Sequence, residues 1–134
     1  MIVQLQSQHV NLLKQETKRV HPVEACAMLF GDLTENVAVV KDVTVTPNKL
    51  KSEVKFEIDP VDAVAAFAAA EKKGLEFIGL FHSHPAPAFP SSLDIKYMKL
   101  WGDSLWLIQS TIDGNLAAYQ LINGEIKQAT INVK

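Results

Sequence analysis

The sequence has only one cysteine, Cys26, among its 134 residues, and it has no lysine- or arginine-rich tract. A lone thiol can form neither an intramolecular disulfide nor a cysteine-rich zinc module. A small domain held together by disulfides or by cysteine-bound zinc is therefore excluded. The net charge of −2 provides no basic field for a phosphate backbone. We therefore expect no nucleic-acid partner.

Long apolar runs are also missing. The longest, Ala63 to Ala70, has eight residues, whereas a membrane-spanning helix needs about 20. The opening stretch MIVQLQSQHVNLLKQ has neither a basic leader nor a continuous apolar core, so a cleaved signal peptide is not expected. These absences predict a cytoplasmic protein that does not bind membranes.

No linker, repeat or low-complexity segment divides the chain. A domain usually has about 100–200 residues, so we expect one domain over residues 1–134. Hydrophobic periodicity, helix-capping residues and turn dipeptides then predict its elements. Helices are expected at 7–20, 60–74 and 90–101, and strands at 25–30, 37–45, 54–58, 75–82, 104–110, 115–121 and 125–133. This order predicts an α/β fold of the mixed α+β kind, a mixed and mostly antiparallel sheet flanked by helices.

Two histidines end one of these strands. In His82-Ser83-His84 the period of two directs both imidazoles to one face of the sheet, and Ser83 to the other. Asp94 follows ten residues after His84. Two histidines and an aspartate are three protein ligands, the number that leaves a catalytic zinc one open position.

Each part of this set also has a structural interpretation. An isolated H-x-H binds no metal in most proteins, and Ser91-x-x-Asp94 is a capping box that would start a helix. The two interpretations compete only for the Asp94 carboxylate. The two histidines a short loop upstream favour ligation.

Other metal-binding families with H-x-H fit poorly. Metallo-β-lactamase-like sites continue with an Asp-His pair, whereas Pro85-Ala86-Pro87 follows here. Amidohydrolases need a barrel of about 250 residues. Cupins need a later histidine, but His9 and His21 both precede the motif.

The stretch from Gly79 to Asp94 resembles the signature of the JAMM (MPN-plus) metalloproteases, a remote Glu followed by H-[ST]-H-P, a short spacer and S-x-x-D. Residues 22–31, PVEACAMLFG, resemble the family segment that carries the remote Glu, here Glu24. The resemblance covers about residues 7–122. The spacer between His84 and Ser91 is one residue shorter than usual, and Ala27 replaces a common glycine.

This resemblance implies a JAMM/MPN core, which is cytidine-deaminase-like, and one zinc ion per chain. His82, His84 and Asp94 would hold the zinc, with water in the fourth position. Glu24 would be the general base on that water and would pass its proton to the leaving amine. Ser91 would donate a hydrogen bond to the oxyanion.

The resemblance further implies hydrolysis of the isopeptide or peptide bond after the C-terminal glycine of a ubiquitin-like or sulfur-carrier protein. Release of cysteine or another small amine from a sulfur carrier is an alternative that uses the same residues. A non-catalytic MPN scaffold is a third, although scaffold versions usually lack the histidines and the aspartate. Whether the chain forms a homodimer is left open.

Overall fold

The computed structural model describes residues 1–134 and contains seven strands and three helices. The strands are β1 (Ile2–Leu5), β2 (Cys26–Leu33), β3 (Val37–Thr46), β4 (Glu76–His84), β5 (Leu105–Ser110), β6 (Leu116–Ile122) and β7 (Glu125–Val133). The helices are α1 (Ser7–Val20), α2 (Pro60–Lys72) and α3 (Ser92–Leu100).

The strands form one closed sheet in the order β1-β3-β2-β4-β5-β6-β7. It closes because the short strand β1 pairs in parallel with both β3 and β7. Strand β4 lies between β2, to which it is antiparallel, and β5, to which it is parallel. The predicted fold class is confirmed, whereas the closure was not predicted.

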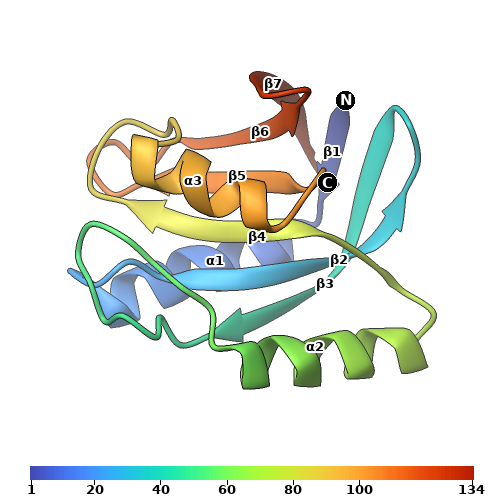
Figure 1. Cartoon of the computed structure of the whole chain (residues 1–134), viewed down its shortest axis with the longest axis horizontal. Coiled ribbons are helices and arrows are strands. Elements are labelled where there is room, and N and C mark those ends of the chain that lie inside the picture. The colour runs from blue at the N-terminus through green and yellow to red at the C-terminus, as the bar shows by residue number, and fades with distance from the viewer.

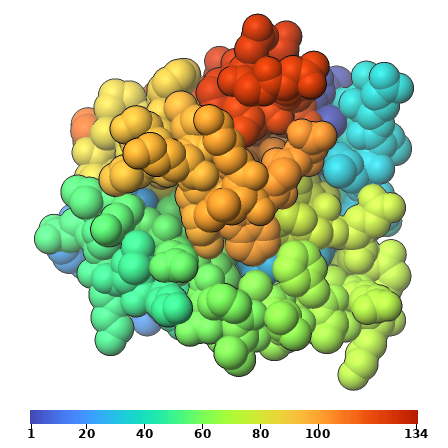
Figure 2. All heavy atoms as spheres, in the orientation of Figure 1, coloured from blue at the N-terminus to red at the C-terminus, as the bar shows by residue number.

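Helices cover the two faces of the sheet. In Figure 1, α1 lies behind β2 and β4, α3 lies in front of β4 and β5, and α2 runs along the bottom of the view below β3. Side chains alternate accordingly: Ala27 and Leu29 of β2 belong to the core under α1, whereas Met28 and Phe30 belong to the core under α2 and α3. The space-filling view shows side chains of α2 and α3 covering much of the front face (Figure 2). Both faces of the central strands are therefore buried, as their apolar runs require.

The predicted strand at 54–58 is wrong. This segment has no strand partner and lies in the connection between β3 and α2. Phe56 and Ile58 enter the core and are buried, whereas Glu57 between them is half-buried and Lys55 before them is exposed. The backbone here is held by a side chain: Asn48 Nδ2 donates to the carbonyl oxygen of Lys55 (3.0 Å).

The first strand was missed. Only four residues form β1, and a polar residue, Gln4, interrupts its apolar pattern. Its pairing with β7 depends on residues more than 120 positions away, so no local pattern could reveal it. None of the three helices has the length and hydropathy needed to cross a membrane.

Gly79 marks the closest approach between β4 and β5. A Cβ atom at this position would lie 1.8 Å from the carbonyl oxygen of Leu105. The obstruction is backbone rather than a flexible side chain, so the strands would have to separate. Glycine is therefore required at this point of the strand that carries the two histidines.

We expect Gly79→Ala to lower the free energy of unfolding by about 3 kcal/mol or more, at the upper end of the cost of overpacking. Gly114→Ala is the matched control, because its φ of +77° disfavours alanine but no atom lies within 4 Å; a loss of about 1–2 kcal/mol is expected there. Urea unfolding followed by circular dichroism measures both. Equal losses would contradict the close approach.

Candidate metal and catalytic centre

Strand β4 directs its two histidines to one face. His82 and His84 lie on the side of α2 and α3, and Ser83 points to the other side as predicted. There the Ser83 hydroxyl oxygen accepts a hydrogen bond from the amide of Ala25 (2.8 Å). The backbone amide of Ser83 in turn donates to the carbonyl oxygen of Ala25 (3.0 Å).

These bonds bring the remote glutamate to the histidines. Cys26 of β2 pairs with His82 of β4, and the Ala25–Ser83 contacts extend this antiparallel pairing by one residue. Glu24 comes next, where the same register would place it opposite His84. The position of Glu24 thus follows from strand pairing, not from proximity in sequence.

The start of α3 supplies the aspartate. Ser91 is the N-cap of this helix, and its hydroxyl oxygen accepts from the amide of Asp94 (3.1 Å). Asp94 Oδ2 accepts from the amide of Ser91 (2.9 Å), which completes the predicted capping box. The same Oδ2 lies 3.1 Å from His82 Nε2. One carboxylate therefore caps the helix and also faces the histidines.

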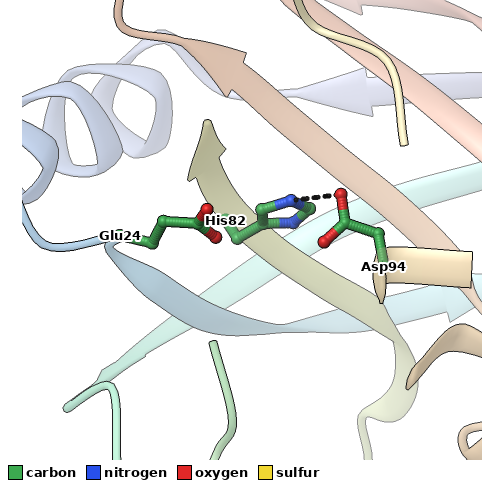
Figure 3. A group of neighbouring side chains, drawn as sticks. All are labelled: Glu24, His82 and Asp94. Carbon is green, nitrogen blue, oxygen red and sulfur yellow. Dashed lines mark hydrogen bonds and ion pairs between the residues drawn. The ribbon is translucent and has the colours of Figure 1, made fainter. Parts of the chain in front are cut away.

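The structure brings Glu24, His82 and Asp94 together, whereas His84 lies beside this group and outside it. Glu24, His82 and Asp94 each offer an atom that could bind a metal, and these atoms all lie within 4.8 Å of one another. His82 lies between the two carboxylates in Figure 3. His84 Nε2 is 4.0 Å from Asp94 Oδ2. All four residues are buried, with exposed fractions of 0–8%.

The orientation of His84 leaves one of its nitrogens available. Its Nδ1 lies 3.2 Å from the carbonyl oxygen of Pro87 and must donate, because that oxygen can only accept. In the neutral imidazole, Nε2 is then the nitrogen with the lone pair, and it lies on the side of Asp94. The loop itself is held by Tyr119, whose hydroxyl donates to the carbonyl oxygen of Ala88 (2.6 Å).

Several buried polar atoms in the centre lack partners within the chain. Both carboxylate oxygens of Glu24 and Nδ1 of His82 are buried without a hydrogen bond. A carboxylate without partners is costly in the interior unless a proton, a cation or water satisfies it. Imidazole nitrogen and carboxylate oxygen are also the donor types that zinc binds in proteins. The residues present therefore fit a zinc ion.

The pKa values of the two carboxyl groups, Glu24 and Asp94, are shifted in opposite directions. Burial, and then the nearby charge of Asp94, raise the pKa of Glu24 to about 8. Burial also acts to raise the pKa of Asp94, but the hydrogen bond and charge of His82, together with the amide of Ser91, outweigh it and leave that pKa below its usual value. In the metal-free protein Glu24 therefore retains a proton at neutral pH and Asp94 does not.

Two supporting residues were missed by the sequence analysis. The ring of Phe56 stacks on His82, with centroids 4.6 Å apart. Asn48 Nδ2 donates to the carbonyl oxygen of Glu24 (3.1 Å). Phe56 lies in the segment expected as a strand, and Asn48 follows the strand expected at 37–45. Side-chain bonds across 24 residues leave no local signal.

Cys26, by contrast, takes no part in the centre. It is fully buried, and burial raises the pKa of its thiol to about 11. Its Sγ contacts the hydroxyl oxygen of Thr46 (3.4 Å). The thiol is a core group, as expected for a small residue at a strand start.

Comparison with known proteins agrees with this architecture. Residues 6–123 match the family model described as prokaryotic homologs of the JAB domain. A desampylase of Pyrococcus furiosus is 46% identical over 87 residues, which are 64% of this chain and 59% of that protein. A CysO-cysteine peptidase of Mycobacterium tuberculosis is 27% identical over 92% of this chain and 86% of its own. A solution structure of a Desulfitobacterium hafniense protein superposes with a TM-score of 0.84 at 27% identity, covering 100% of this chain and 93% of the other.

The raised pKa of Glu24 predicts a pH-dependent stability of the metal-free protein. Between about pH 4.5 and pH 8 the folded state binds a proton at Glu24 that the unfolded state does not bind. Stability from this group is therefore full at low pH and falls by up to about 1.4 kcal/mol per pH unit as pH rises through this window. Glu24→Gln should abolish this contribution.

Urea unfolding in the presence of a chelator, at several pH values between 5 and 9, measures this contribution of Glu24 to stability. When the pH rises from 5 to above about 8, we expect the free energy of unfolding to fall more for the unmodified protein than for Glu24→Gln. Glu35→Gln, at an exposed site, is the matched control and should show no such change. Parallel pH profiles for all three proteins would contradict the buried, protonated Glu24.

Proposed function

Because the chain belongs to the family of prokaryotic homologs of the JAB domain, the predicted family resemblance is confirmed, and from it we propose that this protein is a zinc-dependent hydrolase. It would cleave the isopeptide or peptide bond after the C-terminal glycine of a ubiquitin-like or sulfur-carrier protein. One observation carries the proposal: the partnerless, buried carboxylate of Glu24 lies beside His82 and Asp94.

Three side chains would hold the zinc. His82, His84 and Asp94 are the ligands we propose, and Glu24 stays unligated next to them. Asp94 is suited to this role because its lowered pKa keeps it ionised, and His84 because its Nδ1 bond to Pro87 directs Nε2 inward. When bound, zinc would polarise the scissile carbonyl and acidify the attacking water.

Glu24 is the proton carrier in this proposal. Its carboxylate would take a proton from the attacking water and give it to the nitrogen of the leaving amine as the C–N bond breaks. A nearby cation lowers the pKa of a carboxyl group, so the value of about 8 in the metal-free protein would fall when zinc binds. A pKa close to the working pH suits a group that must both accept and release a proton.

Ser91 is proposed to stabilise the oxyanion. Its hydroxyl oxygen accepts from the amide of Asp94, which leaves the hydroxyl proton free to donate. Ser91 is only partly buried, so a substrate can reach it. Removal of one such donor typically costs about 2.7–4 kcal/mol of barrier.

The substrate class comes from the relatives. One relative is named a desampylase and another a CysO-cysteine peptidase. The second name supports release of cysteine from a carrier protein as the alternative reaction, and that match covers most of both chains. The presence of Glu24, His82 and Asp94 in one buried group, with His84 beside it, weighs against a scaffold without activity.

Incubation of the zinc-loaded protein with C-terminal fusions of ubiquitin-like and sulfur-carrier proteins tests the reaction. One set of fusions carries a peptide after the terminal glycine, and the second carries a single cysteine. Intact mass should show cleavage directly after the glycine. Loss of cysteine alone would select the alternative reaction, and absence of product from every fusion would support the scaffold.

Two substitutions separate metal binding from proton transfer. Glu24→Gln should keep stoichiometric zinc and lose cleavage by about a thousandfold or more, whereas His84→Ala should lose both zinc and cleavage. Metal analysis by mass spectrometry and cleavage rates measure the two properties. A zinc-free preparation that also fails to bind added zinc would refute the metalloprotease proposal.

A further inference from the structure

Both backbone polar groups of Glu24 are held by the loop between β3 and α2, residues 47–59. The amide of Glu24 donates to the carbonyl oxygen of Ser52 (2.9 Å), and the carbonyl oxygen of Glu24 accepts from Asn48 Nδ2 (3.1 Å). The carboxyl group of Glu24, by contrast, has no hydrogen bond within the chain. Its direction is therefore set by packing and by how the backbone of Glu24 is held.

Asn48 fills the centre of this loop. It is buried, and Nδ2 donates to the carbonyl oxygens of Glu24 (3.1 Å) and Lys55 (3.0 Å), with that of Ser52 at 3.4 Å. Oδ1 accepts from the amide of Leu50 (3.1 Å). Because a carbonyl oxygen can only accept and a backbone amide can only donate, these neighbours fix the orientation of the side-chain amide. One side chain thus binds the loop to the residue that we propose as the general base.

The same side chain holds both neighbours of Phe56. Besides its bond to the carbonyl oxygen of Lys55, Asn48 accepts at Oδ1 from the amide of Glu57 (3.3 Å). Phe56, between these two residues, is buried and stacks on His82 with ring centroids 4.6 Å apart. Asn48 therefore connects the backbone of Glu24 with the ring that lies on His82.

We propose that Asn48 is a positioning residue of the catalytic centre. It holds the backbone of Glu24 at a fixed place relative to His82, and so directs the Glu24 carboxyl group toward the water from which it takes a proton. This inference rests on the proposed function. A misplacement of about 1 Å can lower a rate about a hundredfold, so a bond to the backbone of Glu24 can matter as much as a contact with its carboxyl group.

Asn48→Asp tests the proposal with little change of shape. The new oxygen would face the carbonyl oxygens of Glu24 and Lys55, so that two hydrogen bonds are replaced by repulsion, whereas the oxygen that accepts from the loop amides is kept. Ser52→Ala is the matched control. It removes a bond from the same loop, between Ser52 Oγ and the amide of Val54 (3.2 Å), that does not involve Glu24.

Hydrogen exchange of the metal-free protein, followed by amide NMR, measures the effect on Glu24 without any need for activity. In Asn48→Asp we expect the amide of Glu24 to lose protection by about tenfold, because its bond to the Ser52 carbonyl is no longer supported. The amide of Met28, in the middle of β2, should keep its protection, and Ser52→Ala should leave both unchanged. Unchanged protection of Glu24 in Asn48→Asp, or an equal loss at Met28, would overturn the proposal.

Cleavage rates then show whether Asn48 acts through Glu24. Asn48→Asp should lower kcat about a hundredfold, with stoichiometric zinc retained and a much smaller change in KM. In a Glu24→Gln background the same substitution should lower kcat no further, because the group that Asn48 positions is gone. The same loss in both backgrounds would mean a merely structural role and would contradict the proposal. If no variant cleaves any fusion, the proposed function fails, whereas hydrogen exchange still decides whether Asn48 holds Glu24 in place.

Discussion

The pairing of β2 with β4 is the constraint on which the centre depends. It holds Cys26 opposite His82 and is extended by the contacts between Ala25 and Ser83. A shift of one residue would turn every side chain of β4 to the other face, which would exchange the histidines for Ser83 and place them under α1. The hydroxyl of Ser83 opposes such a shift, because only the present register satisfies the amide of Ala25. Strand pairing thus places Glu24 beside the histidines, which no short spacing in the sequence could do.

Asp94 couples the start of α3 to the histidines. Sequence reasoning set the capping box against ligation, on the ground that one carboxylate cannot fully serve both. In the structure the two are compatible, because Oδ2 accepts from the Ser91 amide and also lies 3.1 Å from His82 Nε2. Helix capping thereby fixes the orientation of the carboxylate before any cation binds. A carboxylate in the first turn of a helix is in this way oriented by the helix backbone.

Local patterns predicted the elements that local contacts form. The helix over residues 7–20, the β4 histidines and the α3 capping box all have signals within a few residues, and each is present. Closure of the sheet by β1, the stacking of Phe56 on His82 and the bond from Asn48 to Glu24 join distant segments. Their residues carry no periodicity of their own. At 54–58 the apolar alternation does not mark a strand: Phe56 and Ile58 enter the core without a strand partner, and Val54 is exposed.

The opposite pKa shifts of Glu24 and Asp94 distinguish the roles of the two carboxyl groups. Asp94 lies beside His82 and takes part in both hydrogen bonds of the capping box, and its pKa is lowered. Glu24 has no hydrogen-bond partner, and its pKa rises to about 8. A carboxyl group that stays ionised is suited to hold a cation, and one that retains a proton near neutral pH is suited to carry it. Such divergence between neighbouring acids typically separates an electrostatic role from an acid–base role. The carboxyl group of Glu24 has no hydrogen-bond partner, whereas Asp94 beside it is hydrogen-bonded in the capping box, and this difference supports the proposed proton-transfer role of Glu24.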